Sequence, residues 1–187
     1  AGAGVQWLRD RMKFFNRASE TEKIVKSLKS NNDIYLVPAF TGLGAPYWDA
    51  NSRGVLSGIT RDTSPKEIVR ATIEAVAYQT HDLFEAMKHD GLRPKIVKVD
   101  GGMVMNNWFS QFLSNVVNVK VLRPKVQETT ALGAAFMAGL HIGVYKSLKD
   151  ISRNWHVDKK FSPKMSRKLR SALLEGWIKA IKRTLIN

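Results

Sequence analysis

A pair of glycines between a probable strand and a probable helix is the feature of this sequence best suited to binding a phosphate or a ribose. Residues 96–99 are expected to form a strand, Gly101 and Gly102 follow it, and helical spacing begins at Asn107. Glycine lets a ligand approach the backbone, and the first N–H groups of a helix have no partner within the helix. These residues therefore indicate a ligand-binding turn, although a tight turn without a ligand is the commoner use of such a pair.

Common fingerprints of other enzyme classes are absent. The segment from Gly2 to Trp7 lacks the third glycine of a dinucleotide-binding loop, and no Gly-Lys-Ser or Gly-Lys-Thr of a P-loop occurs. Because the chain contains no cysteine, thiolate metal sites and a cysteine nucleophile are excluded. The 4 histidines are scattered without metal-ligand spacing. A Rossmann dehydrogenase and a P-loop enzyme are therefore not expected.

The carboxylates are interpreted as structural. Glu74 follows Arg70 by four residues on a predicted helix, where the two side chains can pair. Asp49 and Asp62 stand among turn-forming residues, where short acidic side chains are typical. The glycines of the loop at 40–49 could approach a ligand, but a turn is the simpler interpretation. No catalytic carboxylate is assigned.

Strands and helices alternate along the chain, which predicts an α/β domain. The clearest helix follows Ser64, a capping residue with Pro65 at the first helical position and Glu67 completing a capping box. The segment from Ala131 to Gly139 is rich in small residues, which would let its helix pack very closely against a sheet. The expected helices are 5–15, 20–28, 65–87, 107–117 and one from residue 129, and the expected strands are 34–37, 54–59, 96–99 and 119–122.

The composition is that of one globular domain with a strong positive charge. With 187 residues, 44% of them apolar, the chain can bury a substantial core. No apolar run approaches the roughly 20 residues that cross a bilayer, so no membrane span is expected. The formal net charge of +14 would attract polyanions. Much of this charge lies at 158–183, where apolar residues recur every four positions from Leu169 to Leu185, so a basic outer face on a core helix is preferred over DNA or RNA binding.

Several segments together resemble the carbohydrate kinases with an actin-like, ribonuclease H-like fold. The stretch from Gly58 to Glu74 is similar to the family's C-terminal sequence pattern, although Asp62 stands where a glycine is usual. Residues 99–107 resemble the adenosine-binding turn, and residues 129–135 resemble the close-packed helix that follows it. The loop at 41–49 resembles the glycerol kinase branch rather than the xylulose kinases. The resemblance implies a three-layer α/β domain with a mixed sheet.

The resemblance also implies a nucleotide site assembled from distant parts of the chain. By position, Gly2 and Gln6 line the nucleotide site, and Gly102 and Asn106 contact the adenosine portion of ATP or ADP. The implied cofactor set is ATP or ADP with Mg²⁺, and no metal ligand is assigned to this chain. The implied partners are glycerol and ATP, the implied location is the cytoplasm, and a homo-oligomer is compatible with the resemblance.

On this resemblance, residues 1–187 are expected to be the C-terminal nucleotide-binding domain of a kinase, without the start of that domain and without the N-terminal domain. In the family, an upstream Asp takes the proton from the substrate hydroxyl and the N-terminal domain supplies most substrate contacts. The complete enzyme is expected to transfer the γ-phosphoryl group of ATP to glycerol, giving glycerol 3-phosphate, and the chain alone to be inactive. The alternatives are a kinase for another polyol or ketose, and a noncatalytic basic module that binds a polyanion or a partner protein.

Overall fold

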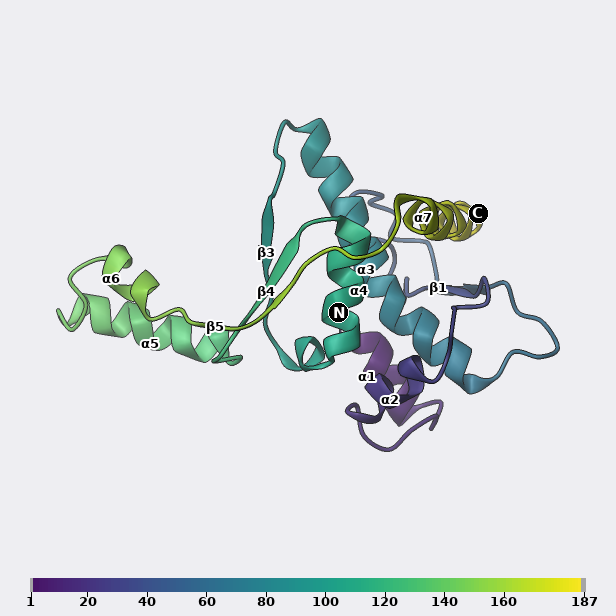
Figure 1. Ribbon diagram of the computed structural model, residues 1–187, viewed down its shortest axis with the longest axis horizontal. Coiled ribbons are helices and arrows are strands. Elements are labelled where there is room, and N and C mark those ends of the chain that lie inside the picture. The colour runs from purple at the N-terminus through teal and green to yellow at the C-terminus, as the bar shows by residue number, and fades with distance from the viewer. Residues whose placement is uncertain (1, 186–187) are drawn as a thin grey trace.

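The computed structural model describes residues 2–185, whose arrangement is drawn in Figure 1. Helices α3 and α4 lie at the centre, with α7 and β1 on one side of them and strands β3, β4 and β5 on the other. In chain order the elements are α1 (Ala3–Asp10), α2 (Glu20–Lys26), β1 (Tyr35–Val37), β2 (Val55–Ser57), α3 (Pro65–His89), β3 (Ile96–Lys98), the 3₁₀ turn η1 (Gly102–Met105), α4 (Asn107–Val117), β4 (Lys120–Pro124), α5 (Thr129–His141), α6 (Leu148–Arg153), β5 (Val157–Phe161) and α7 (Arg167–Thr184).

The strands divide between two small sheets. Strands β1 and β2 pair antiparallel, with Leu36 opposite Leu56. In the other sheet β3 pairs parallel with β4, and β4 pairs antiparallel with β5, so that Val121 has Val97 on one side and Phe161 on the other. The predicted α/β class and mixed sheet are therefore confirmed.

Helix α3 begins as its capping residues predict. The backbone N–H of Ser64 donates to the carboxylate of Glu67 at 3.0 Å, and the hydroxyl of Ser64 accepts from the N–H of Lys66 at 3.3 Å. Ala75 and Tyr78, in the middle of the helix, are almost fully buried. Because apolar side chains extend around more than one face, α3 packs against β1 and α4 at the same time.

Asp82 of α3 joins two other segments to the helix. Its carboxylate accepts hydrogen bonds from the Tyr47 hydroxyl at 2.9 Å and from the Trp177 indole N–H at 2.7 Å. Trp177 is fully buried, as the apolar stripe of the last helix predicts, whereas Leu169 and Leu185 near the ends of that stripe are exposed. Helix α7 therefore docks on the core by its centre, and its lysines point outward.

The helix of small residues forms as α5, but the prediction that it packs closely against a sheet is wrong. Only Gly139 of this helix is buried, and Met137 is 57% exposed. Figure 1 shows α5 and α6 standing apart from α3 and α4. No helix or strand within residues 2–185 packs closely over α5, because small side chains permit close approach but do not supply a partner. Although α5 is apolar, no helix in this range combines the length and apolar composition that crossing a bilayer requires.

The structure also differs from the sequence prediction in the length of the first helix and in three elements that were not expected. Helix α1 ends at Asp10, so Met12 and Phe15 lie outside it, although Phe15 is buried by tertiary contacts. The sequence does not predict η1, α6 or β5. Strand β5 cannot be recognised from the sequence, because three of its five residues are charged and exposed. The apolar alternation of a half-buried strand is therefore absent.

The contact between α7 and β1 depends on a glycine. Gly176→Ala is expected to lower the free energy of unfolding by about 1–3 kcal/mol, because a methyl group here would collide with the Tyr35 ring and hydroxyl. Gly133→Ala on α5 is the matched control, since its methyl group would meet no atom within 4 Å; it is expected to stabilise the protein by about 0.5–1 kcal/mol. Urea unfolding measures both changes. Equal stability of Gly176→Ala and the unsubstituted protein would contradict the close approach of α7 to β1.

Candidate functional site

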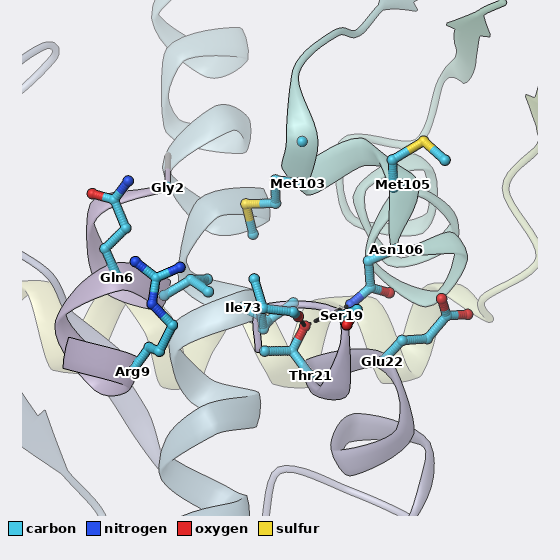
Figure 2. Close-up of a pocket in the computed structure, with 13 residues that line it drawn as sticks. Gly2, Gln6, Arg9, Ser19, Thr21, Glu22, Ile73, Met103, Met105 and Asn106 are labelled. Atoms are coloured by element: carbon cyan, nitrogen blue, oxygen red, sulfur yellow. Dashed lines mark hydrogen bonds between the residues drawn. The ribbon is translucent and has the colours of Figure 1, made fainter. Parts of the chain in front are cut away.

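A cavity of about 410 Å³ lies where α1, α2, α3 and η1 meet. As Figure 2 shows, α1 forms one wall, η1 and the start of α4 form the facing wall, and the segment around the start of α2 lies below, with Ile73 of α3 between the walls. The lining residues are Gly2, Val5, Gln6, Arg9, Ala18, Ser19, Thr21, Glu22, Ile73, Gly102, Met103, Met105 and Asn106.

All four residues assigned from the sequence line this cavity. Figure 2 shows Gly2 and Gln6 at the wall formed by α1 and Asn106 at the facing wall. Gly102 is the first residue of η1 and belongs to that facing wall as well. Helix α3 and strand β3 separate the two pairs along the chain, so the pairs meet only through the fold. The geometry thus brings the four positions together, and nucleotide binding by them stays a prediction.

The two glycines of the cavity are not required by the backbone or by packing. Gly2 has φ −73° and ψ −17°, which any residue adopts, and a Cβ added there would meet no atom within 4 Å. A Cβ on Gly102 would likewise enter open space. By contrast, Gly101 has φ +82°, a conformation that side chains disfavour, and a Cβ on Gly4 would lie 2.7 Å from Thr72. Gly101 therefore forms the turn, while Gly102 and Gly2 leave room beside the backbone.

Asn106 lines the cavity and also makes two hydrogen bonds that stabilise the surrounding structure. Its Oδ1 accepts from the backbone N–H of Phe109 at 2.9 Å, which caps α4, and its Nδ2 donates to the hydroxyl of Thr21 at 3.4 Å. Thr21 is buried and donates in turn to the carbonyl of Ala18 at 2.7 Å. The side chain of Asn106 therefore fixes the start of α4 against α2, whose Thr21 and Glu22 line the cavity together with Asn106.

The charged groups at the cavity are paired with neighbours. Arg9 pairs with Asp10 at 2.7 Å, and Glu22 pairs with Lys26 at 2.6 Å. Burial acts to raise the pKa of Glu22, but the Lys26 ammonium and the N–H of Asn107 outweigh it and hold that pKa below its ordinary value. Within residues 2–185 no group of three or more His, Asp or Glu side chains is placed to hold a metal ion.

The arrangement suits a flat ligand with polar edges. Apolar side chains from three elements face one another across the cavity, and the amide of Gln6 offers both a donor and an acceptor. The lining residues between 18 and 22 could not be identified from the sequence, because their pattern indicates only the start of a helix. Ile73 could not be identified either, because a residue in the middle of a core helix gives no local signal of a cavity.

Comparison with known proteins supports the fold. The sequence profile of the FGGY family of carbohydrate kinases, C-terminal domain, matches residues 1–142. The chain is 52% identical over 183 residues to glycerol kinase 1 of Pseudomonas aeruginosa, covering 98% of this chain and 37% of that protein. It is 47% identical over 186 residues to the glycerol kinase of Gluconobacter oxydans, covering 99% of this chain and 36% of that protein. The chain thus spans little more than a third of the length of these relatives.

Solved structures agree with these relatives. The crystal structure of Plasmodium falciparum glycerol kinase with ADP superposes with a TM-score of 0.87 at 36% identity, over 100% of this chain and 37% of that one. The ligand-bound xylulose kinase of Lactobacillus acidophilus gives a TM-score of 0.80 at 23% identity, over 98% of this chain and 37% of that one. The second likeness concerns the fold alone. Together they confirm the predicted actin-like kinase fold.

The capping bond of Asn106 can be separated from its place in the cavity. Asn106→Ala is expected to cost about 0.5–2 kcal/mol of unfolding free energy, because it leaves the N–H of Phe109 without an acceptor and releases Thr21. Asn106→Ser retains an oxygen that can cap α4 and is expected to keep most of the stability. Urea unfolding of both variants measures the difference, and an alanine variant as stable as the serine variant would contradict the capping role.

Proposed function

The chain belongs to the FGGY family of carbohydrate kinases, and we propose that it forms the ATP-binding C-terminal part of a glycerol kinase. The observation that carries the proposal is the meeting of Gly2, Gln6, Gly102 and Asn106 at one cavity. Two of these residues are glycines that the fold itself does not require, so that room is left for a ligand against both walls. The identity of about half of the residues to glycerol kinases supports glycerol as the acceptor.

In the proposed reaction the γ-phosphoryl group of ATP is transferred to a terminal hydroxyl of glycerol, giving glycerol 3-phosphate. This chain would hold the adenosine part of the nucleotide between α1 and η1 and exclude water from it. The base that takes the hydroxyl proton, and most glycerol contacts, are proposed to lie in an upstream part of the kinase. The isolated chain is therefore expected to bind nucleotide weakly and to show no turnover.

Mg²⁺ is proposed to reach the reaction with the nucleotide, since its role in phosphoryl transfer is to neutralise charge on the phosphates. No residue of this chain is assigned to the ion. A cytoplasmic location fits the use of ATP and stays part of the proposal.

Two other functions find less support. A kinase for another polyol or ketose would share the fold, but the xylulose and gluconate kinases are only 23% identical to this chain. A basic module that binds a polyanion would use the lysines of the last helix. The centre of α7 is buried through Trp177, so its exposed lysines are those expected on the solvent side of a core helix.

Nucleotide binding is tested by filling the cavity at a glycine. Gly102→Asp is expected to weaken Mg-ADP binding about tenfold or more, because the new side chain occupies the cavity and its charge repels phosphate. Gly44→Asp is the matched control, since Gly44 lies outside the cavity and its Cβ would also meet no atom within 4 Å. Calorimetric titration with Mg-ADP measures both. Equal affinity of the two variants would contradict a nucleotide site at this cavity.

Turnover is tested in a chimera in which this chain replaces the matching segment of Pseudomonas aeruginosa glycerol kinase 1. The chimera is expected to phosphorylate glycerol, and Gly102→Asp in the chimera is expected to raise the KM for ATP while the KM for glycerol changes little. The isolated chain serves as the control without turnover. A folded chimera that binds Mg-ADP but does not phosphorylate glycerol would count against this chain as the ATP-binding part of a glycerol kinase.

A further inference from the structure

The turn that carries one wall of the cavity is held from behind by one buried arginine. Arg123 of β4 donates from Nη1 to the carbonyl oxygen of Val104 at 2.9 Å and to that of Met105 at 3.3 Å. The Arg123 side chain is only 8% exposed. Both carbonyls belong to η1, the segment between Gly102 and Asn106.

The turn η1 is only four residues long, and backbone hydrogen bonds tie it to its flanks, from the N–H of Val104 to the carbonyl of Gly101 at 3.3 Å and from the N–H of Asn106 to the carbonyl of Met103 at 3.2 Å. Short 3₁₀ turns have poorer hydrogen-bond geometry than α-helices and depend on their surroundings. The hydroxyl of Ser110 donates to the carbonyl of Val104 at 3.0 Å, so Arg123 and Ser110 share the task of fixing the turn.

Arg123 is itself held by strand β5. Its Nε and Nη2 both lie 2.7 Å from Oδ2 of Asp158, and its guanidinium lies 5.8 Å from the centre of the Phe161 ring. The neighbouring Lys159 donates to Oδ1 of Asn107 at 3.0 Å. Strand β5 therefore braces the wall of the cavity twice, although it lies beyond the residues that match the family profile.

A buried guanidinium needs hydrogen-bond partners in any fold, so burial alone does not connect Arg123 with the site. What connects Arg123 with the cavity is the position of its two acceptor carbonyls. Gly102, Met103, Met105 and Asn106 line the cavity, and the carbonyls that Arg123 fixes lie in the same short turn. Any displacement of these carbonyls would move the cavity wall.

We propose that Arg123, oriented by Asp158, is a positioning residue that fixes η1 so that Gly102 and Asn106 hold the adenosine part of the nucleotide. This inference rests on the proposed function. The guanidinium suits the task because its planar fork reaches a carboxylate and two carbonyls at once. A lysine ammonium keeps the charge but lacks this fork, so it cannot make all of these bonds in one position.

The test compares Arg123→Lys with the unsubstituted protein, both as the isolated chain and in the chimera with Pseudomonas aeruginosa glycerol kinase 1. We expect the Kd for Mg-ADP and the KM for ATP to rise about tenfold or more, with the KM for glycerol unchanged. Asp158→Asn is expected to act in the same direction but less strongly. The double variant is expected to resemble Arg123→Lys, because Asp158 acts through Arg123.

Two controls separate positioning from general effects. Arg153→Lys makes the same exchange in an exposed pair with Asp150 on α6, and no change in nucleotide affinity is expected. Gly176→Ala lowers stability at α7, away from the cavity, and is expected to leave the ADP Kd unchanged at temperatures where the protein is folded.

Hydrogen exchange supplies a readout that does not need nucleotide. In Arg123→Lys the amides of Val104 and Asn106 are expected to exchange faster, and in Gly176→Ala they are not, relative to the rest of the protein. Failure of the unsubstituted chimera to bind Mg-ADP would overturn the proposed function and the positioning role together. Normal ADP binding by Arg123→Lys, or unchanged exchange at the two amides, would overturn the positioning role alone.

Discussion

The buried ion pair between Arg70 and Glu74 on α3 holds the elements around the cavity in one arrangement. Nε of Arg70 lies 2.7 Å from Oε1 of Glu74, whose side chain is 0% exposed. Arg70 also donates to the carbonyl of Leu28, just beyond α2, at 2.7 Å, and its guanidinium lies 5.0 Å from the centre of the Trp108 ring on α4. One side chain thus ties α3 to the segment after α2 and to α4. Residues of α2 and α3 line the cavity, as does Asn106, the N-cap of α4.

The ion pair and the packing around it depend on each other. Burial raises the pKa of Glu74, while Arg70 and the hydroxyl of Tyr78, which donates to Glu74 at 2.9 Å, act against that rise. A buried pair is tolerated only when both charges and their remaining hydrogen bonds are satisfied. Helix α3 can therefore be buried along its middle only if α2 and α4 stand where they complete the pair. The position of the cavity follows from that packing, since Ile73 lies on the same part of α3.

Much of the fold could be predicted because its signals are local. The capping box at Ser64 and Glu67 sets the start of α3, and the spacing of Arg70 and Glu74 predicts their pairing, as the structure confirms. The apolar stripe around Trp177 predicts a core helix in the same way. Strand β5 could not be predicted, because its pairing with β4 is made by the backbone and its side chains are mostly charged. The exposure of α5 could not be predicted either, since a sequence of small residues does not say what covers it.

The sequence by itself determined which residues could serve a ligand, namely Gly2, Gln6, Gly102 and Asn106, because their types and their resemblance to a family pattern are readable one segment at a time. Only the tertiary structure decided that they meet at one cavity, that Gly101 makes the turn while Gly102 leaves the space, and that Arg123 braces the turn. These outcomes depend on contacts between segments far apart along the chain, and the spacing of residues within one segment does not predict such contacts.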